Sequence, residues 1–403
     1  MQCRACGSGN VKSIIPLGRL PLANRLLKAN ELHLEEPKYN LEVMLCEDCG
    51  LAQLKDLVDP KELFSEYVYF SSNSDLMLKS AADLVTSIIP DLKPDSFVVE
   101  IASNDGYLLK NYVEKGVKSL GIDPAKNIAE VANRKGIETL CAFFTENLAL
   151  QLAEKGKKAD IIHANNVMAH VPDINGFVKG IKYLLKDEGT AIIEVPYLLD
   201  LVEKLEFDTI YHEHVYYFSV TPLQKLFQRH GLEIVNIDKI PLHGGTLRLT
   251  VKHVGKRECQ KSVIEFIEQE KTKNVLKFSY YEALIQNLKV LQKKLVEVLH
   301  KIKDEGKSIA AYGASAKGTT LLNYFNIGSE FLDFVVDRSP AKQGYYTPGK
   351  KLPIFSPQEL LNRKPDYALL LTWNFCEEIL GQQAEYRKGG GKFIVPIPEV
   401  RIV

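Results

Sequence analysis

An alternation of short apolar runs and helix-like segments between residues 96 and 197 constrains the fold of this chain most strongly. Residues 96–101 form an apolar, β-branched run, as a strand buried on both faces should. This run ends in the small-residue loop ASNDG at residues 102–106, and a helix is predicted from Tyr107 to about Lys115. The pattern continues with strands that end at Asp123, span 159–164 and cover AIIEVPY, and with helices at 127–135 and 174–185. It predicts an α/β fold, a doubly wound parallel sheet with its ligand at the carboxyl ends of the strands.

The loop after the first strand indicates the ligand. A dinucleotide fingerprint needs GxGxxG, whereas ASNDG has one glycine and several polar side chains, which fits a ligand without phosphates at this point. Asp123, at the end of the second strand, can accept both hydroxyls of a ribose. These features resemble the first motif of class I S-adenosylmethionine methyltransferases, with Ala102 and Asn104 where two glycines are common. Another kind of nucleotide-binding domain is the alternative. The predicted cofactor residues are Glu100, Ala102, Asn104, Asp105, Gly106, Tyr107, Leu108, Asp123, Pro124, Asn165, Asn166 and His170.

Four of the seven cysteines form two CxxC pairs, Cys3 with Cys6 and Cys46 with Cys49. Each pair is expected to fold into a turn that directs both sulfurs at one ion, as in tetrahedral thiolate sites. The strand-to-helix setting of a redox-active CxxC is missing, and four unrelated cysteines are the remaining alternative. We predict a structural Zn²⁺ held by four thiolates, with no open position for chemistry.

Composition excludes several classes of protein. A length of 403 residues predicts two or three domains. The formal net charge is zero, so nothing indicates nucleic acid or an anionic membrane as a partner. The apolar runs are far shorter than a bilayer span, and the start MQCRACGSGN lacks the apolar core of a signal peptide. We therefore expect a cytoplasmic protein.

A second α/β unit is predicted near the C-terminus, after one long or two shorter helices at 262–303. A strand at 308–312 runs into GASAKG, followed by a helix that we expect Thr319 or Thr320 to cap. Small residues and a lysine at a helix N-terminus can hold a phosphate, so a phosphate-bearing substrate is predicted here, and no second cofactor. A purely structural domain is the alternative. The predicted substrate residues of this unit are Ser315, Lys317, Gly318, Arg338 and Lys342.

The stretch YHEHVYYFS, residues 211–219, concentrates polar groups. Read as a strand, it places Tyr211 and Glu213 on one face and His212 and His214 on the other. The spacing of the histidines does not match the HExxH metal motif, and a polar strand without function is a second alternative. Proton abstraction fits best, because a histidine titrates near neutrality and a tyrosine can donate to an oxyanion.

Five segments follow one another along the chain in the order found in one known family: the cysteine pairs, EIASNDGYLL, YHEH, HGGTLR at residues 243–248, and GASAKG. Over almost the whole chain this resembles the S-adenosylmethionine-dependent C-methyltransferases of nucleotide-linked deoxysugars, and YxEHxxYFS and GASAKG are specific to that group. The resemblance implies a zinc-binding domain at 1–70, a class I methyltransferase domain at 71–260 and a Rossmann-like, nucleotide-sugar-binding domain at 261–403.

The resemblance also implies residue roles. His214 is expected to be the general base, with Tyr211 and Glu213 beside it, and Tyr67 or Tyr69 from EYVYFSSNS is expected to approach the sugar. The HGGTLR motif adds His243 and Arg248 as substrate-binding candidates.

Carbon becomes nucleophilic only after loss of a proton next to a carbonyl, so the expected substrate is a nucleotide-linked 4-keto sugar. An O- or N-methyltransferase and a catalytically dead binding protein are the alternatives. The nucleotide, the sugar, the methylated carbon, the stereochemistry and the choice between monomer and weak dimer stay open.

Overall fold

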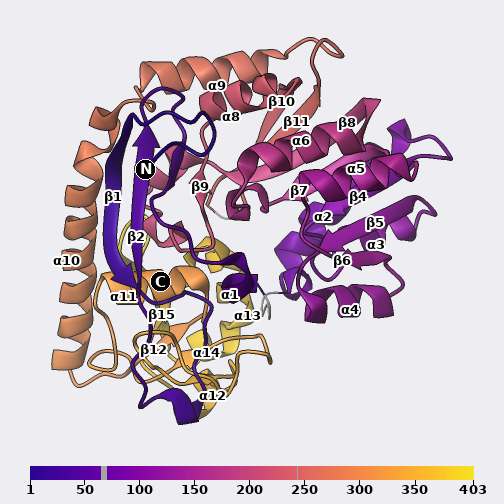
Figure 1. Cartoon of the computed structure of the whole chain (residues 1–403). Coiled ribbons are helices and arrows are strands. Elements are labelled where there is room, and N and C mark those ends of the chain that lie inside the picture. Colours follow the sequence, from indigo (N-terminus) through magenta and orange to yellow (C-terminus); the bar gives the residue numbers. More distant parts are fainter. Residues whose placement is uncertain (65–69, 243) are drawn as a thin grey trace.

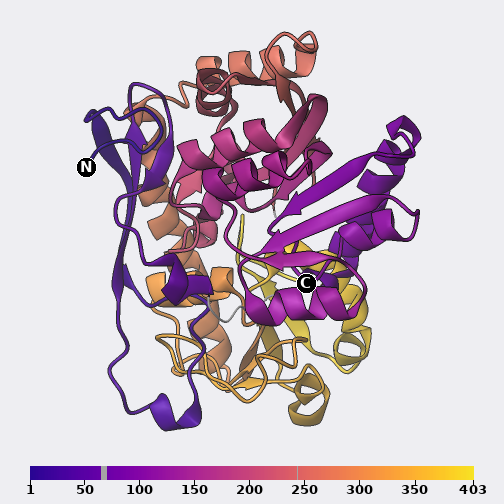
Figure 2. The ribbon, with the colours of Figure 1, turned by 45° about the vertical axis from the view of Figure 1, so that its right-hand side comes forward.

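Three β-sheets organise the chain, and the computed structural model describes residues 1–64, 70–242 and 244–403 (Figures 1 and 2). The N-terminal sheet is antiparallel, with the order β1-β2-β3-β9. Its strands are β1 (Val11–Leu20), β2 (Tyr39–Cys46), β3 (Ala52–Leu54) and β9 (Tyr216–Tyr217). β9 comes from the middle of the chain, so this sheet joins the N-terminal segment to the YHEH segment.

The central sheet has seven strands in the order β10-β11-β8-β7-β4-β5-β6. Six strands run in one direction, and β11, between β8 and β10, runs antiparallel to both of these neighbours. The strands are β4 (Phe97–Ile101), β5 (Lys118–Asp123), β6 (Thr139–Cys141), β7 (Ala159–Asn165), β8 (Leu185–Pro196), β10 (Leu232–Ile240) and β11 (Thr246–His253). The predicted doubly wound α/β sheet is confirmed.

The helices that precede, connect and follow these strands include one at each of the three segments predicted as helical between strands, 107–115, 127–135 and 174–185. They are α1 (Pro60–Phe64), α2 (Asp75–Ile88), α3 (Leu109–Val113), α4 (Lys126–Arg134), α5 (Glu146–Glu154), α6 (Ile174–Leu184), α7 (Leu198–Glu203) and α8 (Val220–Arg229). Purple strands of the central sheet direct their arrowheads towards the middle of the molecule in Figure 2. Ligands of such sheets bind at this edge.

The C-terminal sheet has the order β14-β13-β12-β15-β16-β17 and is parallel except for β17. Its strands are β12 (Ile309–Tyr312), β13 (Val335–Val336), β14 (Ile354–Phe355), β15 (Tyr367–Leu370), β16 (Lys392–Val395) and β17 (Arg401–Ile402). The later helices are α9 (Lys261–Thr272), α10 (Glu282–Asp304), α11 (Ala316–Tyr324), α12 (Glu359–Arg363), α13 (Cys376–Gln382) and α14 (Ala384–Lys388). The segment at 262–303 therefore forms two helices, one of the two predicted forms.

Helix α10 joins the N-terminal and C-terminal sheets into one core. Its buried leucines recur at helical spacing, from Leu284 through Leu288, Leu291 and Leu295 to Leu299. They belong to one apolar cluster with side chains of β1 and β12, and α10 runs alongside β1 (Figure 1). The N-terminal and C-terminal units therefore share a packed core and are not merely joined by a linker.

The cap of α11 differs from the prediction. The helix begins at Ala316, and the Ser315 hydroxyl caps it by accepting from the Gly318 amide at 3.1 Å. Thr319 and Thr320 lie inside the helix, where each hydroxyl donates to a backbone carbonyl of another part of the chain, Ala23 and Ile210 respectively. The cap prediction was wrong because Ser315 reaches the helix amides first, and the threonines make interdomain contacts.

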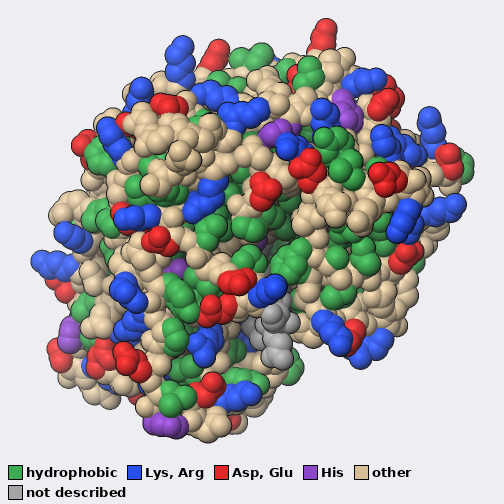
Figure 3. Space-filling view, in the orientation of Figure 1, with side chains coloured by type: hydrophobic (Ala, Val, Ile, Leu, Met, Phe, Trp, Pro, Cys, Tyr) green, Lys and Arg blue, Asp and Glu red, His purple; other side chains and the backbone are tan. Residues whose placement is uncertain are grey.

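Surface charge is mixed rather than segregated. Acidic and basic side chains are interspersed over the face shown in Figure 3, in keeping with a formal net charge of zero. Among the described helices, none has the length and apolar character needed to cross a bilayer.

Candidate active site

A cavity of about 700 Å³ opens where the three units meet. Residues of the central sheet loops, of the YHEH segment and of the C-terminal unit all line it, and so does Asn24 of the N-terminal unit. Eight of the predicted cofactor residues line its wall: Ala102, Asn104, Tyr107, Asp123, Pro124, Asn165, Asn166 and His170. The cavity therefore lies at the carboxyl ends of the central strands.

Two residues of the loop after β4 that are not glycines adopt a backbone conformation typical of glycine. Ala102 and Asn104 have φ values of 55° and 49°, in the left-handed region that glycine usually occupies. Asp123 accepts from the amides of Asn104 and Ala125, each at 2.9 Å. Burial raises the pKa of Asp123 to about 6. Each carboxylate oxygen keeps a further lone pair, which can accept a ribose hydroxyl.

The other predicted cofactor residues support this loop from behind and do not line the cavity: Glu100, Asp105, Gly106 and Leu108. Asp105 pairs with Lys135 at 2.9 Å and accepts from the Ser72 hydroxyl. Gly106 has a φ of 78°, and a Cβ there would lie 2.4 Å from Cδ1 of Ile137. These residues hold the loop in shape without facing the cavity.

The YHEH segment forms a turn, whereas the alternation of its residues fits a strand. β9 includes only Tyr216 and Tyr217, and the His214 amide donates to the Tyr211 carbonyl at 2.9 Å. The turn brings residues three apart together, so the Tyr211 hydroxyl lies 2.8 Å from Nε2 of His214. Alternation would have placed these two side chains on opposite faces.

His214 is held in one tautomer. Its Nδ1 lies 2.9 Å from the carbonyl oxygen of Thr209, which can only accept, so Nδ1 carries a proton. In the neutral ring Nε2 is then the basic atom and accepts from Tyr211. The ring of His170 packs edge-on against His214 with ring centres 4.7 Å apart, and burial lowers the pKa of His170 to about 4. Tyr211, His214 and His170 all line the cavity.

The other two residues of the turn are directed away from the cavity. Glu213 is buried and accepts from Nδ2 of Asn24 at 2.6 Å. His212 is buried with Nε2 3.2 Å from the carbonyl of Tyr39. Asn24 had not been predicted, since it lies 189 residues away from Glu213 in the chain and no local pattern marks it.

The predicted substrate residues of the C-terminal unit differ in whether they line the cavity and in which groups they contact. Ser315, Lys317, Arg338 and Lys342 line the cavity, whereas Gly318 lies inside α11. Lys342 donates to the Ala314 carbonyl at 2.8 Å. The ammonium of Lys317 lies 4.7 Å from the centre of the Trp373 ring, beside the buried carboxylates of Glu206 and Asp208.

Four further candidates have no established contact with the cavity. Arg248 forms an ion pair with buried Glu194 at 2.7 Å and does not line the cavity. Tyr67, Tyr69 and His243 lie outside the described residues. The contribution of EYVYFSSNS and HGGTLR to substrate binding stays a prediction.

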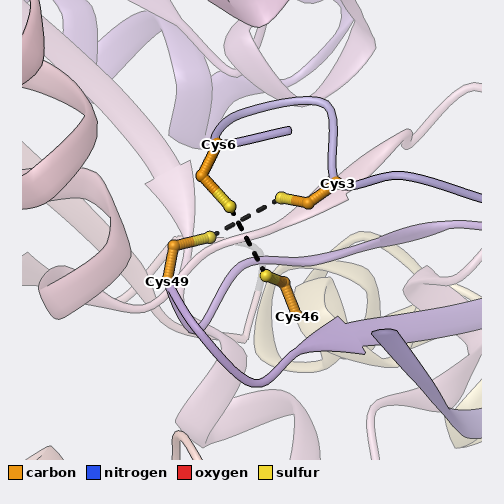
Figure 4. Close-up of side chains that lie close together, drawn as sticks. All are labelled: Cys3, Cys6, Cys46 and Cys49. Carbon is orange, nitrogen blue, oxygen red and sulfur yellow. Dashed lines mark hydrogen bonds between the residues drawn. The ribbon is translucent and has the colours of Figure 1, made fainter. Parts of the chain in front are cut away.

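The four predicted cysteines converge at the end of the N-terminal sheet (Figure 4). Their sulfur atoms all lie within 4.8 Å of one another, and the pairs Cys3–Cys49 and Cys6–Cys46 are each 3.6 Å apart. Four Zn–S bonds of about 2.3 Å in a tetrahedron require sulfurs roughly 3.8 Å apart, and a disulfide would require about 2 Å. The cluster therefore fits zinc, and no cysteine of the four faces the cavity.

Similarity to known proteins shows which family the chain belongs to. Models of a zinc binding domain, a methyltransferase domain and a C-methyltransferase C-terminal domain match residues 3–64, 75–237 and 241–398. The C-methyltransferase NovU of Streptomyces niveus is 33% identical over 405 aligned residues, which cover 100% of this chain and 96% of NovU. The chain belongs to this C-methyltransferase family. Its cofactors are S-adenosylmethionine and a zinc ion bound by Cys3, Cys6, Cys46 and Cys49.

More distant similarity is confined to part of the chain. A ubiquinone biosynthesis O-methyltransferase of Bartonella quintana is 24% identical over 155 residues, 34% of this chain and 61% of that enzyme. A solved S-adenosylmethionine-dependent methyltransferase of Clostridium acetobutylicum has a TM-score of 0.36 at 14% identity, covering 46% of this chain and 94% of that one. NovU, by contrast, matches all three units of this C-methyltransferase.

Proposed function

We propose that this C-methyltransferase methylates a ring carbon next to the ketone of a nucleotide-linked 4-keto sugar. The observation that carries the proposal is the Tyr211–His214 pair, which lines the same cavity as the loop after β4. Transfer to oxygen or nitrogen needs no base that can form an enolate. Transfer to carbon needs one, together with a donor for the oxyanion.

His214 Nε2 is the proposed base. It takes the proton from the carbon next to the ketone, and the electrons of the broken C–H bond form the enolate while charge moves to the carbonyl oxygen. Tyr211 can then redirect its hydroxyl from Nε2 to that oxygen, or an ordered water can donate in its place. The Thr209 carbonyl keeps Nδ1 as a donor and stabilises the imidazolium that results.

We assign S-adenosylmethionine to one end of the cavity and the nucleotide sugar to the other. Ala102, Asn104 and Asp123 would hold S-adenosylmethionine, which supplies an electrophilic methyl group on a sulfonium. The C-terminal unit, with Arg338 at its edge, would hold the nucleotide diphosphate. Alignment of the enolate carbon with the methyl group can supply several kcal/mol of the required rate enhancement.

Proton exchange tests the proposal before any methyl transfer. The enzyme is incubated in deuterated water with a nucleotide 4-keto sugar and without S-adenosylmethionine. We expect deuterium to replace the proton at the carbon next to the ketone. If that proton stays while a methyl group is found on oxygen or nitrogen in the complete reaction, the proposal is wrong.

A separate experiment tests the alternative that this protein keeps the methyltransferase fold but has no catalytic activity. Calorimetry with S-adenosylmethionine and with its demethylated product should show binding of both. No binding of either at millimolar concentration would favour a protein that keeps the fold and lacks the activity.

A further inference from the structure

Asn24 belongs to the N-terminal unit, yet it reaches the cavity at the centre of the molecule. It lies in the segment between β1 and β2 and is only partly buried, because its side chain lines the cavity. Glu213, one residue before the proposed base, is 3% exposed and does not line the cavity. Asn24 therefore stands between Glu213 and the space for the substrate.

The backbone around Asn24 is held in place by the C-terminal unit. The neighbouring Ala23 carbonyl accepts from the Thr319 hydroxyl at 2.9 Å. Leu27 and Tyr346 exchange two backbone hydrogen bonds of 2.9 Å each. Ala23 and Leu27 are buried. This segment is thus fixed at both sides of Asn24, which suits a residue that must present one group accurately.

Glu213 orients the side chain of Asn24. Nδ2 of Asn24 donates to Oε1 of Glu213 at 2.6 Å, and an ionised carboxylate can only accept. With Glu213 ionised, the amide nitrogen of Asn24 faces Glu213 as in this hydrogen bond, which leaves the amide oxygen as an acceptor for a group in the cavity. Burial raises the pKa of Glu213 to about 7, and the Asn24 amide opposes that rise.

We propose that Asn24 binds the substrate and that Glu213 is a positioning residue acting through it. The Asn24 oxygen accepts from a hydrogen-bond donor, a hydroxyl or an amine, on the sugar ring near the carbon that His214 deprotonates. This inference rests on the proposed function. It gives the N-terminal unit a role in substrate selection in addition to holding zinc.

A double-mutant cycle tests the link between the two residues. Asn24→Ala removes the acceptor, and Glu213→Gln leaves the volume unchanged but no longer dictates which end of the amide faces the cavity. We expect each variant to lower kcat/KM for the nucleotide sugar about tenfold or more, the cost of one hydrogen bond to a buried group. The double variant should be no worse than Asn24→Ala alone. Penalties that multiply would show that Glu213 acts on its own and would overturn the proposal.

Controls separate this result from misfolding. Asn30→Ala changes an exposed asparagine of the same connection outside the cavity and should leave kcat/KM unchanged. S-adenosylmethionine affinity and zinc content should match the wild type in every variant. If Asn24→Ala loses zinc, Asn24→Ser, which has a smaller side chain that cannot reach Glu213, replaces it in the cycle.

Matched substrates identify the recognised donor. Binding of nucleotide 4-keto sugars that carry a hydroxyl, an amine or only hydrogen beside the reacting carbon is measured by calorimetry, without turnover. We expect the wild type to prefer one of the two donor-bearing sugars over the hydrogen-bearing sugar, and Asn24→Ala to lose that preference. An unchanged preference in Asn24→Ala would sink the inference. A wild type that binds no keto sugar would instead show that the proposed function has failed.

Discussion

His214 is the side chain on which the proposed proton abstraction depends. We expect His214→Asn to lower kcat by about 10²- to 10⁴-fold, because the asparagine keeps no basic nitrogen in place of Nε2. Deuterium exchange into the keto sugar should fall in parallel, and S-adenosylmethionine affinity should stay near the wild-type value. Both are measured on the same preparation.

His212→Asn is the matched control, since His212 is buried against Tyr39 and does not line the cavity. It should lower the melting temperature more than the exchange rate. A His214→Asn enzyme with nearly full exchange would show that the base is another residue.

Lys317 compensates two buried carboxylates shortly before the turn at residues 211–214. Asp208 is fully buried and accepts from the Trp373 indole at 2.7 Å, and Glu206 is 3% exposed. Burial raises the pKa of Asp208 to about 6 and that of Glu206 to about 7, and Lys317 opposes both rises. Asp208 precedes Thr209, whose carbonyl orients His214, so this charge balance bears on the position of the proposed base.

Removal of the Lys317 charge should make stability more sensitive to pH. Since both carboxyl pKa values are higher in the folded state than in the unfolded state, the folded state binds more protons, and the free energy of unfolding falls as pH rises from about 4 through the folded pKa values. Lys317→Met raises those values further, and each added pKa unit costs about 1.4 kcal/mol above the new pKa.

Melting curves should therefore show a larger deficit of Lys317→Met against the wild type at pH 8.5 than at pH 6. Lys317→Arg keeps the charge and should follow the wild-type profile. A deficit that is the same at both pH values would contradict the proposed charge compensation.

At the level of elements, the predictions held where a segment's own residues decide its structure. The apolar, β-branched run at 96–101 predicts a buried strand from its own residues, and β4 lies there. The helical spacing of the leucines likewise predicts α10. The turn at residues 211–214 did not follow from alternation, because tertiary contacts decide it. The Val215 carbonyl accepts from Leu54 of β3, and the Val215 amide donates to Ala169, 46 residues earlier in the chain.

In the candidate site, too, residues with a local sequence pattern could be predicted, and residues that depend on tertiary contacts could not. Cofactor and base residues carry local patterns, a loop after a strand and a cluster of Tyr, Glu and His, which sequence reasoning could find. Asn24 and Trp373 carry none, since their significance comes from contacts with Glu213 and Asp208 across 189 and 165 residues. Similarly, Lys317 and Lys342 look alike in the sequence, and only the fold shows which anions already surround them.

The four cysteines lie at the end of a sheet that also includes β9, next to the candidate active site. β3 pairs with β9, which follows the turn at residues 211–214, so order in the N-terminal sheet extends to Tyr216 and Tyr217. We expect Cys46→Ser to lose zinc, to lower the melting temperature and to speed amide exchange in β2, β3 and β9. Cys259→Ser changes an exposed cysteine outside the cluster and should have no such effect. Full zinc content with an intact melting curve in Cys46→Ser would refute this structural role.

At the scale of the whole molecule, the candidate active site lies where three units meet. The central sheet supplies the cofactor loop, the turn before β9 supplies Tyr211 and His214, and the C-terminal unit supplies the far wall. Hydrogen bonds from Thr319 to Ala23 and from Thr320 to Ile210 connect these parts through α11. Such a site can hold two substrates in a fixed relation, which methyl transfer to carbon requires.

The electrostatics of the far wall lead to a test of how the nucleotide is bound. The charge of Lys317 is attracted by Asp208 and Glu206, and Lys342 is 3.5 Å from Asp337, so both lysines have anionic neighbours within the protein. Arg338 is about half exposed at the cavity edge, with Glu378 at 3.4 Å and Asp75 at 3.9 Å, in pairs that solvent weakens. We therefore expect Arg338 to be the cation that a substrate diphosphate recruits.

Arg338→Ala should raise KM for the nucleotide sugar about tenfold, the magnitude of one charge-assisted hydrogen bond, and leave S-adenosylmethionine affinity unchanged. Added salt should raise KM in the wild type more than in Arg338→Ala, because the variant has already lost the interaction that salt screens. Arg387→Ala, an exposed arginine of α14 outside the cavity, is the control for a general change in net charge. If Arg338→Ala and Arg387→Ala behave alike, the diphosphate is held by backbone amides and the compensated lysines instead.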